Sequence, residues 1–322
     1  MAVVIKTNME SLIVQKNLNA ATVALDRSIN RMSTGYKINQ ASDNAANFSI
    51  ANSWVTKLGS LDVATENASM GKDLLSTTEQ NYDLLTTHLQ RIRDLTEQAA
   101  NGTYGSVSLK AIQSEIKSRL QEISRVAANT EFNDIKLMSS SPILTNGIDL
   151  QVGLDSSADS VINLASSLFS DASVSGLFSS NSAFMTIVNA ANGGEAPESL
   201  NSDDGYSAIA GAFAGLKKDN GKWVIQTASG YKPKDTLSAL DAAISEISSR
   251  VTTIGSAQNR VDSAISALDV RSTNLTSSLS TIRDTDVAAE SSAYIQAQIL
   301  QQASATLLST ANQLPSVALN LI

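Results

Sequence analysis

The residues that could support catalysis are few and lie apart in the chain. The one histidine, His88, is preceded on the same predicted helix by Glu79 and Asp83, but no His-Glu-x-x-His motif is present. No glycine-rich phosphate loop follows a predicted strand. The many serines have no paired base, and the chain contains no cysteine. The sequence therefore predicts no catalytic site, no metal site and no cofactor, and we expect a protein that is not an enzyme.

Charge and hydropathy exclude two further classes of function. The formal net charge is -8 and no run of lysine or arginine is present, so the chain lacks the basic patch that binding to nucleic acid requires. No stretch of about 18 apolar residues occurs, which excludes a membrane-spanning helix. Residues 1–16 contain no continuous apolar segment, so we expect any export to use a route other than a conventional signal peptide.

The elements of the chain are predicted from its helix breakers. Residues 1–141 and 234–314 contain no proline, whereas ten of the sixteen glycines lie between these two segments. We therefore expect two long helical arms separated by a compact insert. The predicted division is 1–44, 45–165, 166–234, 235–284 and 285–322.

The C-terminal arm has the clearest periodicity. Apolar residues recur at alternating steps of three and four from Leu237 to Ile282, and only Gln258 and Ser272 interrupt them. A repeat of this length is typical of a coiled-coil helix, with an N-cap expected near Asp235. The residues predicted at the centre of this bundle seam are Leu240, Ile247, Ile254, Val261, Leu268 and Leu275.

The N-terminal arm shows four shorter apolar stripes, which predict separate helices that bundle together. The first stripe ends near Gly35, the third near Asn101-Gly102 and the fourth near Phe132-Asn133. In the insert, Asn146-Gly147 after Ile143-Leu144 predicts a β-hairpin. Asn220-Gly221 predicts a second strand pair, and residues 209–216 a short helix. The fold class is thus mainly α, with paired coiled-coil-like arms, a β-hairpin and a small α+β insert.

The last segment indicates self-association. Residues 291–322 contain no charged side chain, yet their apolar residues fall on one helical stripe. An amide-rich helix without ions is poorly suited to a solvated surface but can be buried among copies of itself, because no charge must be desolvated. The predicted self-association residues of both ends are Leu18, Leu25, Ile29, Met32, Ile295, Ile299, Ala303, Leu307 and Leu314.

Several collinear motifs resemble those of bacterial flagellins. The N-terminal part has IKTN at 5–8, RMSTGYKIN at 31–39 and LQRIRDL at 89–95; the C-terminal part has AQILQQA at 297–303 and ANQLP at 311–315. The similarity spans roughly residues 1–165 and 235–322. Asp134 and Ser304 depart from the family pattern, since each stands where a flagellin often has glycine.

The resemblance implies a secreted subunit that polymerises into the extracellular flagellar filament. It implies that both termini pair as helices of an inner tube, and that the partners are other copies, an export chaperone, the filament cap and hook-associated proteins. It further implies a patch at Leu89, Arg91, Leu95 and Glu115, which is either recognised by host Toll-like receptor 5 or lies at the interface between subunits. Two alternatives stay open from the sequence, namely a hook-filament junction protein and a secreted coiled-coil adhesin.

Overall fold

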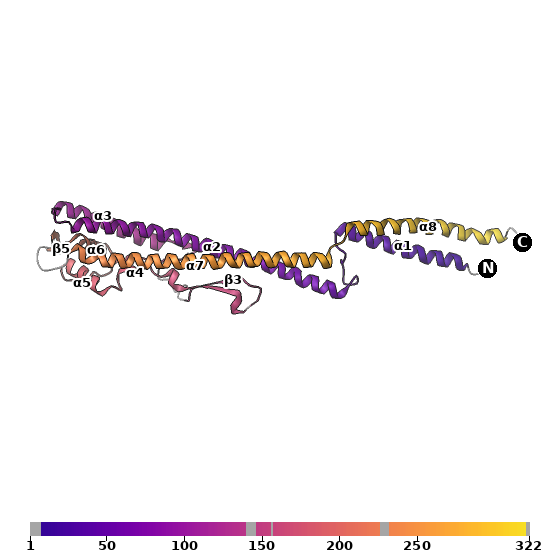
Figure 1. Ribbon diagram of the computed structural model, residues 1–322, viewed down its shortest axis with the longest axis horizontal. Helices are drawn as coiled ribbons and strands as arrows, with labels where there is room; N and C mark the ends of the chain where they lie inside the picture. The colour runs from indigo at the N-terminus through magenta and orange to yellow at the C-terminus, as the bar shows by residue number, and fades with distance from the viewer. Residues whose placement is uncertain (1–7, 140–145, 156, 226–231, 320–322) are drawn as a thin grey trace. The chain divides into compact units, whose positions relative to one another are not determined.

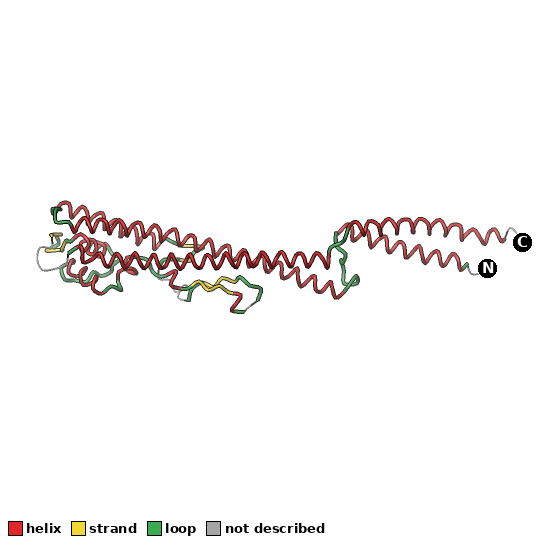
Figure 2. The backbone as a smooth tube through the Cα atoms, viewed as in Figure 1, coloured by secondary structure: helices red, strands yellow, loops and turns green. Residues whose placement is uncertain are grey.

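The computed structural model describes residues 8–139, 146–155, 157–225 and 232–319, and the side chains only up to residue 313. It is dominated by long helices, with short strands confined to hairpins (Figure 2). The chain divides into two compact units. Unit 1 comprises Met1–Asp62 and Val270–Ile322, and unit 2 comprises Val63–Asp269.

Unit 1 is built on two antiparallel helices, α1 (Met9–Thr34) and α8 (Val287–Leu319), which lie side by side (Figure 1). The Asn8 side chain caps α1 by accepting a hydrogen bond from the Ser11 backbone N–H. Gly35 ends the helix in the left-handed conformation at φ 74°, which a residue without Cβ adopts at little cost. The predicted pairing of the two ends is confirmed.

The connections that follow α1 and precede α8 bind one another. Tyr36 and Asp284 form an antiparallel β-bridge, and the Lys37 N–H donates to the Arg283 carbonyl at 2.6 Å. The Arg283 guanidinium lies over the Tyr36 ring, 4.0 Å from its centroid, which adds a cation–π contact. The two chain segments are therefore joined at this point of unit 1.

Three helices form the bundle of unit 2: parts of α2 (Ala45–Ala100) and α7 (Pro233–Arg283), and all of α3 (Ser106–Asn129). The second and third predicted stripes, expected in separate helices, lie in the single helix α2, because no break such as the Asn101-Gly102 pair that follows α2 separates them. Helix α7 begins two residues before the expected cap, with Pro233 in its first turn. Proline is tolerated there because the first N–H groups of a helix have no partner within it.

Two hairpins have turn residues in the left-handed region. Strand β5 (Leu216–Asp219) pairs with β6 (Lys222–Ile225) across Asn220-Gly221, so this predicted strand pair is confirmed. Strand β1 (Glu131–Phe132) pairs with β2 (Ile135–Lys136) across Asn133 and Asp134. Asp134 has φ 65°, a conformation that the glycine frequent at this position in flagellins would adopt without strain.

Strand β3 (Ile148–Gln151) pairs with β4 (Val161–Leu164), and Ile143-Leu144, the expected partners of β3, lie outside the described residues. A short 3-10 helix, η2 (Ala158–Ser160), precedes β4. The hairpin packs on α2 at Gly71, where an added Cβ would stand 2.3 Å from Leu150 Cδ1. Glycine at this position thus allows the strand to approach the helix closely.

The insert contains η3 (Ser166–Phe169), α4 (Val174–Phe178), α5 (Ser182–Ala191) and α6 (Asp203–Ala214). Three phenylalanines from α4, α5 and α6 pack together with ring centroids 5.1 to 5.9 Å apart. The described residues of 166–234, which is expected as an outer domain, share one continuous core with α2, α3 and α7. Within the described residues, no helix is long and apolar enough to cross a membrane.

Candidate functional site

His88 lies beside a pair of charged side chains at the surface and is not part of a catalytic group. Its Nδ1 lies 3.5 Å from Arg119 Nη1, and Arg119 also donates to Glu115. Burial, and then the positive charge of Arg119, lower the pKa of His88. Glu79, which precedes this histidine on the same helix, accepts a hydrogen bond from Gln258 at 2.7 Å. Among the described residues no group of histidine, aspartate and glutamate has the arrangement of a metal site.

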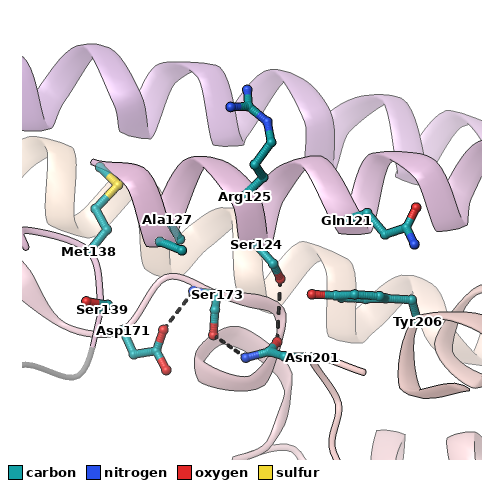
Figure 3. Close-up of a pocket in the computed structure, with 11 residues that line it drawn as sticks. Gln121, Ser124, Arg125, Ala127, Met138, Ser139, Asp171, Ser173, Asn201 and Tyr206 are labelled. Carbon is teal, nitrogen blue, oxygen red and sulfur yellow. Dashed lines mark hydrogen bonds between the residues drawn. The ribbon is translucent and has the colours of Figure 1, made fainter. Parts of the chain in front are cut away.

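A polar groove of about 460 Å³ lies between α3 and the insert (Figure 3). Its walls are joined by hydrogen bonds: Asn201 Oδ1 lies 3.5 Å from Ser124 Oγ, and Asn201 Nδ2 donates to Ser173 Oγ at 3.2 Å. Asp171 accepts from the Ser173 N–H at 2.8 Å. Because these groups satisfy one another, the groove is the place where the insert attaches to α3.

The most buried side chains of the contact between α1 and α8 are small. The positions along it recur at steps of three and four, and its most buried residues are Ala21, Ser28, Ala297, Ser304 and Ala311. Hydrogen bonds join the start of α1 to the last part of α8, from Ser11 Oγ to Asn312 Oδ1, and the middles of the two helices, from Gln301 Nε2 to Thr22 Oγ1. Ser304, which departs from the family pattern, is thus part of this seam. Small residues bring two helices close together but bury little apolar surface.

Several large apolar side chains of α1 and α8 lie on the outside of the pair. Ile295, Ile299, Leu300 and Leu307 of α8 are each more than half exposed. The first three line an open groove of about 390 Å³. On α1, Leu12, Ile13 and Val23 are also more than half exposed. A row of exposed aliphatic side chains on two neighbouring helices is a surface that requires a partner.

The predicted self-association residues fall into two groups. Leu18 and Leu25 are half-buried. The other described members are exposed, and they are Ile29, Met32, Ile295, Ile299, Ala303 and Leu307. The side chain of Leu314 lies outside the described part of the chain. The sequence grouped these residues in one stripe on each helix, whereas the structure divides them between an inner and an outer face.

The predicted bundle seam lies in the core along most of its length. Leu240, Ile247, Ile254 and Val261 are fully buried, Leu268 is almost so, and Leu275 is half-buried. A second row of buried residues on α7 consists of Ala243, Arg250 and Ala257. The other apolar residues of the 3-4 repeat, which alternate with the seam residues along the sequence, are only half-buried. The reason is that α7 also contacts the insert.

The receptor patch implied by the resemblance requires a correction. Leu89 is 0% exposed and Leu95 is 2% exposed, so neither side chain contributes to the surface of this chain. Both belong to the core that α2 forms with its neighbours in unit 2. Arg91 and Glu115 are partly exposed and form an ion pair at 3.1 Å. Leu95, four residues after Arg91, lies on the inner side because its helix is covered on more than one face.

Polar contacts that the sequence did not predict fix the antiparallel register of α2 and α7. Lys72 pairs with Asp262, and Arg93 pairs with Asp241, each at 2.7 Å. Between them, buried Arg250 donates to the Tyr82 hydroxyl at 3.3 Å. The only sequence signal for Arg250 is that it shares the heptad row of Ala243 and Ala257.

Arg250 and Tyr82 also hold the start of the insert. Arg250 donates to the Ser170 carbonyl at 3.0 Å, and the Tyr82 hydroxyl donates to the Leu168 carbonyl at 3.0 Å. Burial raises the pKa of the Tyr82 phenol, although the nearby Arg250 charge opposes that rise. The two arms and the insert are therefore joined by one buried polar cluster.

Comparison with known proteins gives the family. Residues 5–142 match the bacterial flagellin N-terminal helical region, and residues 237–322 match the bacterial flagellin C-terminal helical region. Flagellin B of Vibrio cholerae serotype O1 is 30% identical over 378 aligned positions that cover all of both chains. The chain belongs to the bacterial flagellin family.

Other flagellins show similar agreement. Flagellin B of Vibrio anguillarum is 31% identical over 379 positions, and polar flagellin A of Vibrio parahaemolyticus is 30% identical over 382 positions, again over the whole of each chain. Among solved structures, the crystal structure of Bacillus cereus flagellin matches with 20% identity. That match covers 63% of this chain and 88% of that chain, with a TM-score of 0.40.

Membership of the flagellin family gives the function. The protein is a structural subunit of the bacterial flagellar filament, which lies outside the cell, and it is not an enzyme. Flagellins polymerise with copies of themselves, so the exposed apolar rows of unit 1 belong to a chain that assembles. The region between the two matched segments, residues 143–236, contains the insert.

Proposed function

We propose that unit 1 drives polymerisation of this flagellin by burying the outer faces of α1 and α8 against other copies. The observation that carries the proposal is the inverted distribution of side chains: the most buried residues between the two helices are alanines and serines, with Leu18 and Leu25 half-buried beside them, while Ile295, Ile299, Leu300 and Leu307 are more than half exposed. Burial of one Ile or Leu side chain contributes roughly 1.5–3 kcal/mol. Several such residues per subunit offset the entropy of ordering two helices.

The absence of charge in the C-terminal segment supports the same proposal. Glu290 is the last charged residue of the sequence, so no ion after it would have to leave water when α8 is covered. Its amide and hydroxyl side chains can pair with those of a neighbouring copy. We infer that residues 1–44 and 285–322 form the inner tube of the filament, and that residues 45–165 and 235–284 form the outer one.

We also propose that the chain is secreted by the flagellar export route with a chaperone on its C-terminal arm. The exposed aliphatic row of α8 supports this proposal, because such a surface aggregates unless a chaperone covers it before assembly. The filament cap and the hook-associated proteins are the further partners that we expect. Residues 166–234 are proposed to face the outside of the filament.

Assembly after heating and cooling of the purified full-length chain tests the main proposal. Deletion of residues 291–322 should abolish filament formation and leave unit 2 folded. Ile299→Glu should also prevent assembly, because a carboxylate would be buried without a partner. Ile299→Met is the matched control, since it keeps an apolar side chain of similar size, and this variant should assemble.

The readouts are electron microscopy for filaments and circular dichroism for the bundle. Normal filaments from the truncated chain or from Ile299→Glu would refute the role of the α8 outer face. A chain that never polymerises but adheres to surfaces would favour the adhesin alternative. Short caps in place of filaments would favour the hook-filament junction.

We propose that Arg91 and Glu115 form the polar centre of a surface recognised by Toll-like receptor 5. Their partial exposure supports this role, and their pairing holds the two side chains in a fixed arrangement. Alanine at both positions should lower receptor signalling in a reporter cell assay. Arg125→Ala, which removes another exposed arginine paired with a glutamate of its own helix, is the control and should leave the signal unchanged.

A further inference from the structure

The chain contains four Asn-Gly pairs, at residues 101–102, 146–147, 192–193 and 220–221. An Asn-Gly bond is chemically labile, because glycine has no side chain to keep its backbone nitrogen away from the asparagine amide. We propose that Asn101 is a site of spontaneous deamidation in this protein, and that the structure protects the other three asparagines.

Asn101 lies in the loop between α2 and α3, and both it and Gly102 are exposed. Its Oδ1 accepts a hydrogen bond from the Thr103 N–H at 3.3 Å, so the side chain folds forward over the Gly102 peptide. The structure contains no hydrogen bond from the Gly102 N–H within the described ranges. An added Cβ at Gly102 would meet nothing within 4 Å, and the Asn101 carbonyl accepts a long hydrogen bond, from the Tyr104 N–H at 3.4 Å, so this peptide is held weakly.

The reaction needs only water and hydroxide. Hydroxide removes the Gly102 amide proton, and the nitrogen attacks Asn101 Cγ. A C–N bond forms and the bond from Cγ to the side-chain nitrogen breaks, so that ammonia leaves and a five-membered succinimide remains. Water then adds to one of the two ring carbonyls and opens the ring to aspartate or isoaspartate. No electrons are gained or lost.

The other three pairs are held by their surroundings. Asn192 is 9% exposed, and its amide donates to the Glu195 carbonyl and to Asp204, so two hydrogen bonds must break before it reacts. At Gly147 an added Cβ would stand 2.1 Å from the Leu164 carbonyl oxygen, which shows how tightly this peptide is packed.

Asn220 is exposed but conformationally locked. It has φ 47° in the two-residue turn between β5 and β6, where Asp219 pairs with Lys222. Cyclisation would rotate the Gly221 peptide out of this turn and open the strand pair next to it. Asn101 has no such constraint, since its φ is not positive and no strand flanks its loop.

Deamidation at Asn101 changes the charge next to the end of helix α2. The product adds one negative charge just beyond the C-terminus of α2, where the helix dipole already disfavours an anion. The last turn of α2 contains no basic residue to offset it. The formal net charge would change from -8 to -9. Isoaspartate would also lengthen the backbone of the loop by one carbon.

The test is to incubate the purified monomeric full-length chain in mildly alkaline buffer in water labelled with heavy oxygen. Digestion and mass spectrometry then report label incorporation at each of the four sites. We expect Asn101 to react about tenfold faster than Asn192, which is the ratio that one additional hydrogen bond to be broken produces. We also expect it to react faster than Asn220, whose cyclisation must first open the turn. Equal rates at the four sites, or a faster reaction at Asn220, would overturn the proposal.

Two variants sharpen the result. Gly102→Ala should slow the reaction at Asn101 without disturbing the fold, because the space for a Cβ is empty. Asn101→Gln should abolish it at this position and leave the other three rates unchanged. If Gly102→Ala reacts as fast as the natural chain, the exposed backbone of Gly102 is not the cause. Circular dichroism of both variants confirms that they are folded.

Discussion

The two compact units of this flagellin bury opposite kinds of side chain. Unit 2 has Tyr82, Leu89, Ile116 and Phe178 completely buried, whereas the most buried residues between α1 and α8 in unit 1 are alanines and serines. The large aliphatic side chains of α8 lie instead on its outer face. The comparison teaches that unit 2 has a core of its own, while unit 1 leaves large aliphatic side chains exposed, as the proposed assembly through α1 and α8 requires.

Two isoleucine truncations test this contrast most strongly. Ile254→Ala removes a fully buried side chain and should destabilise unit 2 by about 2–5 kcal/mol. Ile299→Ala removes a side chain that is 60% exposed, so it should change the stability of the monomer by about 0.5 kcal/mol or less. It should nevertheless impair polymerisation. Denaturant unfolding of the monomer and light scattering of assembly measure the two effects, and equal losses of monomer stability would break the comparison.

An overpacking variant tests the small-residue seam of unit 1. Ala297 is 5% exposed between α1 and α8, so Ala297→Leu should force the two helices apart at a cost of about 1–3 kcal/mol. Assembly should slow, while the unfolding transition of unit 2 stays where it was. Filament growth at the normal rate would mean that close approach of these helices is not required.

A pair of glycine substitutions tests how closely the hairpin approaches the bundle. Both glycines are helical, so alanine gains helix propensity at each, but only at Gly71 does the new Cβ collide with Leu150. Gly255 has open space around it. Gly71→Ala should therefore be less stable than Gly255→Ala by about 1 kcal/mol. Hydrogen exchange of β3 should increase in the first variant alone.

The smallest expected effect is a dependence of stability on pH. The pKa of His88 is lowered in the folded chain. As pH falls below the ordinary histidine pKa of about 6.5, the unfolded chain therefore binds a proton at His88 more readily than the folded chain does. This histidine should therefore favour unfolding in that window and have no effect above it. His88→Gln should flatten this part of the stability curve of unit 2, and an unchanged slope would assign it to other groups.

The sequence by itself determined the arms, the insert and the family. Proline-free segments and a 3-4 repeat predict long paired helices, because these features act through local backbone conformation and the helical period. Asn220-Gly221 predicted its hairpin for the same reason, since a two-residue turn of type I′ requires two left-handed residues in succession. The absence of charge from residues 291–322 predicted a helix suited to burial against other copies of the chain.

Only the tertiary structure decided which face of each helix is covered. Leu95 and Ile299 are both aliphatic residues of amphipathic helices, yet one is buried and the other is open. Arg250 occupies a row that a heptad assigns to apolar residues, and it is satisfied there by carbonyls that the insert brings from 79 or 80 positions away in the chain. Such outcomes depend on which elements meet in space, and a local periodicity contains no information about that.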